Sequence, residues 1–394
     1  MSALRSADDP VVGLTRELVA ASSQNPGEDE RAVAEVITTA CAQLGLPSPA
    51  RIGVSSRPNL LTRLEFGPGG QHLLLCGHSD TKPIGEGKWA TDPLALTELD
   101  GELRGRGAVD MKGAIAAMLL AAASLAANPP VRGALTLAFL ADEENGARFG
   151  GRWLAENEPL QADAAVIGEP GGLVHPWDHL HLGSRGICNF DLEVATAQGH
   201  TGLRDALGTV SATEVLARLI VALRDEFAPT TPSRSWGQPS VSPGVLIEGG
   251  VNYGVLPGAA SARNECRLVP GMDEERFRKE LETFVAARTP EGARVTVSVR
   301  DWIDAAGVDP QEPIAIAARR TLEETLGQVP PDYIFPATTD GTWLARMGIP
   351  TLPALGPGLL RHAHAVDERV TRKELVQAQT LYERLVRRFC ERQP

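Results

Sequence analysis

Residues 137–146 read LAFLADEENG. The stretch begins as an apolar run with the length of a buried strand and ends in three consecutive acids, Asp142, Glu143 and Glu144. Buried carboxylates are unfavourable unless they are paired, so the end of such a strand requires solvent or a cation. A solvated exit from the strand is the simpler interpretation. The alternative is a metal site in which one glutamate binds the ion and the other holds a water, as metal-assisted hydrolysis requires.

The composition indicates a folded, acidic protein without nucleic-acid or membrane partners. The chain has 394 residues, which suggests two domains, and its net charge is -12 with acids and bases interspersed. The five cysteines are scattered and form no CxxC pair. No apolar run reaches the length of a membrane span, and the N-terminus lacks the apolar core of a signal peptide. We therefore expect a cytoplasmic protein with reduced thiols.

Apolar periodicity predicts strands and helices in alternation on both sides of a different middle segment. Strands are expected at residues 59–66, 72–76, 133–141, 164–167 and 351–355, and helices at residues 10–22, 27–44, 113–127, 150–157, 311–326, 339–346 and 371–390. This alternation predicts an α/β fold with a mostly parallel sheet. The middle segment follows the order strand, helix, strand, strand, helix, strand, which predicts an inserted α+β domain of the ferredoxin-like type. The expected domains are residues 1–182 with 298–394, and residues 183–297.

Acids and histidines follow several of the predicted strands or glycine turns. They are His78, Asp110, Glu143, Glu144 and Glu169, and His364 supplies a further imidazole late in the chain. The carboxyl ends of parallel strands form the usual ligand site of such sheets. His78 and Asp80 stand two residues apart, so the carboxylate of Asp80 can hold the His78 ring. These donors suit zinc, or cobalt and manganese, and the excess of carboxylates over the charge of one divalent ion predicts two ions.

Five segments together resemble the motif set of the M20 metallopeptidases. They read GHSDTKP at 77–83, GRGAVDMKGA at 105–114, DEENG at 142–146, GEP at 168–170 and AHAVDE at 363–368. The resemblance covers nearly the whole chain, with the motifs in the family's order. It implies a zinc-hydrolase catalytic domain that carries an inserted lid and dimerisation domain.

The resemblance also implies which residues hold the ions. His78, Asp110 and Glu169 would hold one zinc ion. Asp110, Glu144 and His364 would hold the other, so that Asp110 bridges the two. Cobalt or manganese in place of zinc stays open.

Catalytic roles follow from the same resemblance. Glu143 would act as the general base and then as the general acid, while Asp80 would orient His78. The family often has a cis peptide bond after the bridging aspartate, which corresponds here to Asp110–Met111.

The inserted segment resembles the family's lid. The motif QGHTG at 198–202 places His200 as the residue that assists the tetrahedral intermediate, in dimeric members from the partner subunit. Arg267 and Asn252 are the expected substrate-binding residues, with a solvated strand residue as the alternative for Arg267. The sequence departs from the family at Gly254, where an asparagine is usual.

The predicted reaction is hydrolysis of the amide bond of an N-acyl amino acid or a similar small peptide-like substrate. Within the family, Glu169 favours a deacylase of the acetylornithine deacetylase or desuccinylase kind over a dipeptidase. Carboxypeptidase G2-like or dipeptidase activity is the alternative. A non-hydrolytic metal- or ligand-binding protein on the same fold is the alternative from another class, although Glu143 argues against it. The expected partners are a small-molecule substrate and a second copy in a homodimer formed through the lid.

Overall fold

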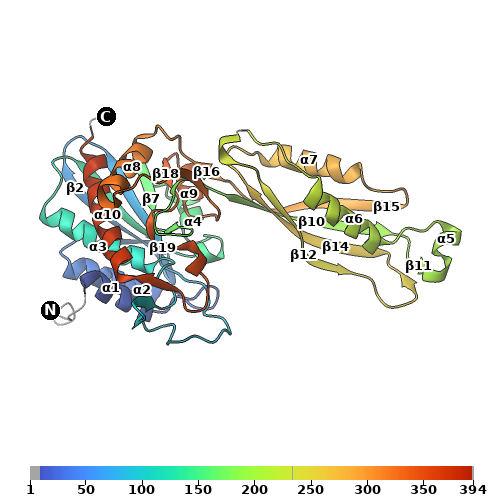
Figure 1. The fold of residues 1–394 in the computed structure, drawn as a ribbon, viewed down its shortest axis with the longest axis horizontal. Coiled ribbons are helices and arrows are strands. Elements are labelled where there is room, and N and C mark those ends of the chain that lie inside the picture. Colours follow the sequence, from blue (N-terminus) through green and yellow to red (C-terminus); the bar gives the residue numbers. More distant parts are fainter. Residues whose placement is uncertain (1–8, 233, 393–394) are drawn as a thin grey trace. The chain divides into compact units, whose positions relative to one another are not determined.

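The computed structural model describes residues 9–232 and 234–392, which form two compact units. Unit 1 comprises Met1–Gly183, Gly307–Phe335 and Thr339–Pro394, and unit 2 comprises Ser184–Ala306 and Pro336–Thr338 (Figure 1). The expected boundary after residue 297 falls inside strand β15 (Ala293–Ile303). Unit 2 extends beyond that boundary because β15 pairs with β10 (Gly186–Thr196) along its whole length.

A six-stranded sheet forms the centre of unit 1. Its order is β1 (Ala50–Val54), β2 (Arg57–Gly67), β6 (Gly133–Leu140), β3 (His72–His78), β7 (Ala164–Ile167) and β18 (Thr351–Leu352). The last four strands are mutually parallel, whereas β1 and β2 add antiparallel pairs at one edge. Every residue of β6 and β7 is buried, as expected for parallel strands that are covered on both faces. The prediction of a mostly parallel sheet is confirmed.

Seven helices belong to unit 1 in the described part of the chain. They are α1 (Pro10–Ala20), α2 (Arg31–Gln43), α3 (Lys112–Ala127), α4 (Gly151–Asn157), α8 (Pro313–Leu326), α9 (Gly341–Arg346) and α10 (Arg372–Cys390). Helix α3 is apolar around its circumference because α1, α10 and β3 all pack against it. Helix α10 begins at a capping box formed by Thr371 and Glu374.

Short elements connect this framework. They are β4 (Thr97–Leu99), β5 (Glu102–Arg104), β8 (Pro170–Gly172), β9 (Leu180–Ser184), β16 (Ala306–Gly307), β17 (Asp332–Phe335), β19 (Gly356–Leu359), β20 (Arg369–Thr371) and the 3-10 turns η2 (Glu143–Asn145) and η5 (Leu360–His362). Strand β20 pairs with β5, and this pairing ties the C-terminal ligand segment to the segment before Asp110.

A four-stranded antiparallel sheet, covered by two helices on one face, forms the centre of unit 2 (Figure 1). The sheet order is β12 (Ser240–Gly249), β14 (Ala259–Leu268), β10 and β15, and the helices are α6 (Ala212–Asp225) and α7 (Glu274–Ala286). Alternate residues of β10 and β14 pack with both helices into one apolar core. The order strand, helix, strand, strand, helix, strand agrees with the predicted ferredoxin-like unit. At one end lie β11 (Gly199–His200), β13 (Val255–Leu256), α5 (Arg204–Leu207) and the 3-10 turn η3 (Thr201–Leu203).

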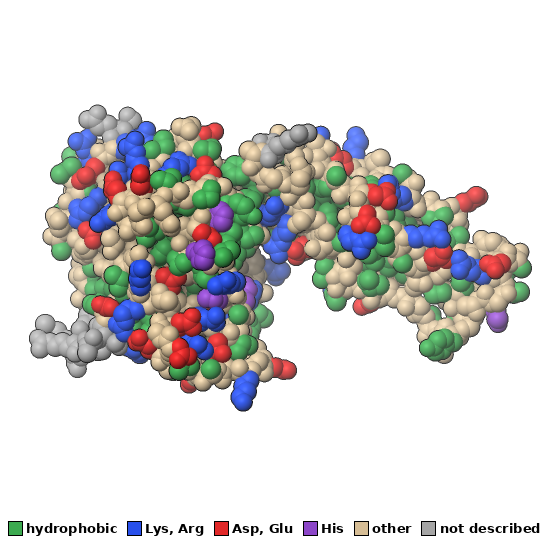
Figure 2. Space-filling model, viewed as in Figure 1, with side chains coloured by type: hydrophobic (Ala, Val, Ile, Leu, Met, Phe, Trp, Pro, Cys, Tyr) green, Lys and Arg blue, Asp and Glu red, His purple; other side chains and the backbone are tan. Residues whose placement is uncertain are grey.

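Within the described residues, no single helix is long and apolar enough to cross a membrane. The segments Thr201–Leu207 and Ala212–Asp225 meet that criterion only as a pair, which is bent by 76°. Because the apolar face of α6 packs into the core of unit 2, its hydrophobicity is accounted for by the fold. Acidic and basic side chains are interspersed on the face shown in Figure 2, in keeping with the sequence pattern.

Candidate metal centre

The sheet of unit 1 gathers five of the predicted site residues. Strands β6, β3 and β7 are parallel neighbours, so their carboxyl ends lie at one edge. His78 ends β3, Glu144 follows β6 in η2, and Glu169 follows β7. Asp110 precedes α3, and His364 follows η5. Segments that are far apart in the sequence therefore converge on one place.

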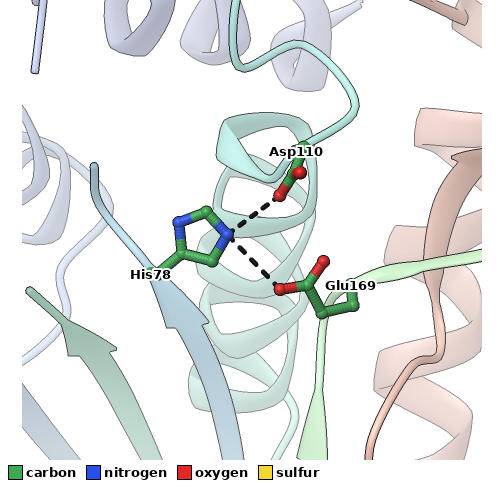
Figure 3. Close-up of side chains that lie close together, drawn as sticks. All are labelled: His78, Asp110 and Glu169. Atoms are coloured by element: carbon green, nitrogen blue, oxygen red, sulfur yellow. Dashed lines mark hydrogen bonds and ion pairs between the residues drawn. The ribbon is translucent and has the colours of Figure 1, made fainter. Parts of the chain in front are cut away.

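His78, Asp110 and Glu169 form the first group of possible ligands (Figure 3). His78 Nε2 lies 2.9 Å from Asp110 Oδ1 and 3.4 Å from Glu169 Oε1. All three residues are buried. Their donor atoms lie within 4.8 Å of one another, which is the spacing that one ion requires.

Asp110, Glu144 and His364 form the second group. His364 Nε2 lies 3.1 Å from Asp110 Oδ2 and 3.1 Å from Glu144 Oε1. The two oxygens of Asp110 therefore face different histidines, and Asp110 belongs to both groups. This is the arrangement that a bridging carboxylate requires.

The electrostatics of both groups favour a cation. Burial lowers the pKa of His78, but hydrogen bonds to Asp110, Asp80 and Glu169 outweigh burial and raise it well above its ordinary value. Burial also lowers the pKa of His364, but Asp110 and the neighbouring glutamate raise it to about 10. The carboxylates therefore favour a proton on each imidazole when no ion is bound. A metal ion would replace that proton on the ring nitrogen. Imidazole and carboxylate donors in this number fit zinc, cobalt or manganese.

Asp80 lies behind His78, as the sequence analysis expected. His78 Nδ1 is 3.0 Å from the backbone oxygen of Asp80 and 3.4 Å from its Oδ1, so the backbone carbonyl is the nearer acceptor. The Asp80 carboxylate accepts hydrogen bonds from the backbone N–H of Glu143 and of Glu144, each at 3.1 Å, and from Asn25 Nδ2 at 2.8 Å. Asp80 therefore positions the two glutamates as well as the histidine ring.

The two adjacent glutamates have different surroundings. Glu144 joins the second ligand group, and Lys82 Nζ lies 3.3 Å from its Oε2. Glu143 is half-buried and belongs to neither ligand group among the described residues. Burial raises the pKa of Glu143 well above its ordinary value, and the charge of Glu169 raises it further. Divalent ions in the ligand groups would favour the ionised form of this carboxylate, which could then take up a proton from water.

Sequence reasoning missed an ion pair beside Asp110. Glu368 Oε2 lies 2.7 Å from Arg106 Nη1, and Glu368 Oε1 accepts from the backbone N–H of Val109 and of Asp110. Both side chains are buried. Each residue stands inside a quoted motif, GRGAVD or AHAVDE, so the motif positions were the signal that could have identified them.

Two further buried acids carried no sequence signal. Glu30 accepts hydrogen bonds from Ser79 Oγ at 2.5 Å, Arg57 Nη1 at 2.8 Å and the backbone N–H of Asp142 at 3.0 Å, and thereby supports the strand ends behind the site. Asp340 is 2% exposed, and neither carboxylate oxygen has a hydrogen-bond partner among the described residues. Burial raises the pKa of Asp340 to about 8.

The remaining predicted residues belong to unit 2. His200 is exposed, and its Nδ1 accepts from the backbone N–H of Gly202 at 3.1 Å, which leaves Nε2 to carry the proton in the neutral ring. Thr201 donates its N–H to the carbonyl of Gly254, so the turn with Asn252 lies beside His200. Gly254 has φ +78°, a region that glycine and asparagine both adopt. This explains how glycine can replace asparagine there.

Arg267 lies away from His200 within unit 2. It stands near the C-terminal end of β14, opposite Ile187 and Ser240, and its Nε lies 2.8 Å from Glu265 Oε1. His200 pairs with Val255, beyond the other end of β14. At about 3.3 Å per residue, the length of β14 separates the two by roughly 25 Å or more.

Comparison with known proteins gives concordant results. Residues 74–388 match the sequence profile of peptidase family M20/M25/M40. The chain is 30% identical over 398 residues to the succinyl-diaminopimelate desuccinylase of Gluconacetobacter diazotrophicus, with 98% of this chain and 99% of that protein aligned. It is 31% identical over 334 residues to the acetylornithine deacetylase of Myxococcus xanthus, with 82% of each chain aligned.

Solved structures share the fold. An M20 family metallo-carboxypeptidase from Sulfolobus solfataricus superposes with a TM-score of 0.78 at 19% identity, covering 97% of this chain and 99% of that chain. A dinuclear metal-binding peptidase of the M20 family from Bacillus subtilis superposes with a TM-score of 0.68 at 16% identity, covering 97% and 98%.

Proposed function

Because this chain belongs to peptidase family M20/M25/M40 and is a metal-dependent amidohydrolase, we propose that it releases an acyl group from an N-acylated amino acid. The observation that carries this proposal is the pair of adjoining ligand groups that share Asp110, with Glu143 beside them but outside both. A purely metal-binding protein has no need of such a carboxylate.

The proposed cofactor is a pair of divalent ions, with zinc as the first candidate. His78, Asp110 and Glu169 would hold one ion, and Asp110, Glu144 and His364 the other. The structural relative from Bacillus subtilis is a dinuclear metal-binding peptidase, which supports the number two. When bound, such ions polarise a carbonyl group and lower the pKa of a water.

The chain's own residues then carry the proton. Glu143 takes a proton from the attacking water with its carboxylate and returns it to the leaving nitrogen. Asp80 holds the backbone of Glu143 by the 3.1 Å hydrogen bond to its N–H, and so fixes where the base stands. The backbone oxygen of Asp80 lies 3.0 Å from His78 Nδ1 and keeps the ring oriented, so one residue positions both the base and a ligand.

The proposed substrates carry a short acyl group on an amino acid. A desuccinylase and a deacetylase are among the sequence relatives, whereas two dipeptidases and a tripeptidase share only the fold, at 20% identity or less. The test is a panel of N-succinyl and N-acetyl amino acids, including those of diaminopimelate and ornithine, beside unmodified dipeptides. We expect turnover of at least one N-acyl compound; hydrolysis of the dipeptides alone would refute the deacylase proposal.

We also propose that the protein is a homodimer in which His200 serves the partner's site. Within unit 2, His200 lies at the end of the sheet opposite the chain crossings at residues 184 and 306. Strand β12 is an edge strand, and Val245, Leu246 and Ile247 on it are 54–60% exposed. An exposed apolar edge of this kind suits pairing with the same edge of a second copy.

A neutral His200 with its proton on Nε2 is prepared to donate to a developing oxyanion. Arg267 is proposed to bind a substrate carboxylate, for which it would have to exchange its ion pair with Glu265. Asn252 is proposed as a further polar contact beside His200.

We propose a cytoplasmic location on the basis of the five buried cysteines, all of which are free.

A further inference from the structure

The buried ion pair between Arg106 and Glu368 requires an explanation. Arg106 Nη1 lies 2.7 Å from Glu368 Oε2, with side-chain exposures of 3% and 0%. Removing two charges from water costs about as much as their attraction returns, so a buried ion pair is weak evidence for a stabilising role. Neither residue belongs to a ligand group. The contacts that the pair makes with its neighbours therefore have to indicate its role.

Glu368 holds the turn that carries Asp110. Its Oε1 accepts from the backbone N–H of Val109 at 3.0 Å and from that of Asp110 at 3.1 Å. Its backbone oxygen accepts from the N–H of Gly105 at 3.0 Å. Glu368 therefore fixes both ends of the turn whose last residue faces both histidines.

Arg106 holds the loop that carries His364. Its Nη2 donates to the backbone oxygen of His364 at 3.4 Å and to that of Pro83 at 3.3 Å. His364 has φ +60°, a left-handed conformation that is unfavourable for a residue with a side chain and persists only where its surroundings enforce it. Arg106 is itself restrained, because its guanidinium lies 5.2 Å from the ring centroid of Trp89.

We propose that the Arg106–Glu368 pair positions the second metal ion by fixing His364 relative to Asp110. The inference rests on the proposed two-ion centre. Arg106 of this pair contacts the backbone of His364, which belongs to the second ligand group only. His78 and Glu169 of the first group instead lie at strand ends that the main sheet holds. Loss of the guanidinium fork should therefore weaken the second ion and leave the first nearly unaffected.

Arg106→Lys tests this most directly. Lysine keeps a positive charge beside Glu368, but one ammonium group cannot reproduce a planar guanidinium whose Nη1 pairs with Glu368 while its Nη2 donates to two backbone oxygens. Metal-stripped wild type and variant are titrated with zinc in a calorimeter. Wild type should bind two ions, and Arg106→Lys should bind the first within about threefold of the wild-type affinity and the second about 10- to 100-fold more weakly.

Arg104→Lys is the matched control. Arg104 stands two residues away, and its ion-pair partners Asp100, Glu102 and Asp367 lie outside both ligand groups. This variant should show both binding steps of the wild type. Thermal unfolding of the metal-free proteins verifies that each variant is folded.

An unchanged second step in Arg106→Lys, or an equal loss from both steps, would overturn the inference. A wild type that binds a single ion would overturn the proposed two-ion centre as well, and that failure is recognised without any variant. If Arg106→Lys does not fold, Glu368→Gln decides by the same measurement. Its amide oxygen can still accept from Val109 and Asp110, so the second step should weaken while the first is retained.

Discussion

Asp340→Asn is expected to stabilise the metal-free protein, by an amount that increases with pH. Asp340 is buried, and its two oxygens have no hydrogen-bond partner among the described residues. Burial raises its pKa from 3.8 to about 8, and the charges of Asp80 and Glu169 contribute to the increase. Asparagine has nearly the same shape but cannot ionise, so the variant removes the titration and little else.

The pKa values determine the sign and the size of the effect. Above pH 3.8 the unfolded chain releases the Asp340 proton, whereas the folded chain retains it up to about pH 8. The folded state then binds more protons, so the stability of the wild type falls as pH rises through this window. A tenfold change in proton affinity corresponds to about 1.4 kcal/mol, which gives an upper bound of roughly 5 kcal/mol at pH 8. Below pH 4 the two proteins should be equally stable.

The assay is urea unfolding of metal-free wild type and Asp340→Asn at pH 4, 6 and 8. The difference in unfolding free energy should increase across this series, and bound divalent ions should reduce it because nearby cations favour the ionised carboxylate. Asp205→Asn changes an exposed residue of unit 2 and serves as the control for the substitution itself. A difference that is the same at all three pH values would refute the reasoning, because it would show that Asp340 does not titrate in this range.

Four further predictions concern the ions, the base and His200. Elemental analysis of protein purified without chelator should find about two divalent ions per chain, and full activity without metal would contradict the proposal. Metal binding should release protons because His364 is protonated in the metal-free site, with a pKa of about 10; calorimetry in buffers of different ionisation enthalpy measures this. Glu143→Gln should retain the ions and lose about 10²–10⁴-fold in turnover, whereas Glu144→Gln should lose the second ion. Mixed dimers of His200→Ala and Glu143→Gln subunits should regain activity, and inactive heterodimers verified by native mass measurement would exclude action of His200 in the partner's site.

The parts of the fold with strong local patterns were predictable from the sequence. The uninterrupted apolar run of β6 indicates a strand buried on both faces, and parallel neighbours bring the residues after such strands to one edge. This is why His78, Glu144 and Glu169 were expected together. The amphipathic helices of unit 2 were equally clear, and in the structure Asp273 caps α7 by accepting from the backbone N–H of Arg276.

Other features depend on tertiary structure that no local pattern encodes. A buried acid and a solvated acid look the same in a sequence, so Asp340 and Glu30 could not be distinguished from surface carboxylates. The strand expected at residues 351–355 forms ladder pairs with β7 only over Thr351–Leu352, although the N–H of Leu355 still donates to the carbonyl of Ile167 in β7. Sequence patterns also gave no indication that Arg267 lies near one end of β14 while His200 lies beyond the other end, on the short strand β11.

The order of the ligands along the chain has a consequence for biosynthesis. His78, Asp110 and Glu169 all precede the inserted unit, whereas His364 follows it. A ribosome therefore completes one ligand group before it begins unit 2, and it completes the other only after unit 2 has been made. The nascent chain has the donors for one ion throughout the synthesis of unit 2, and the second ion can be bound only by a chain that is nearly finished.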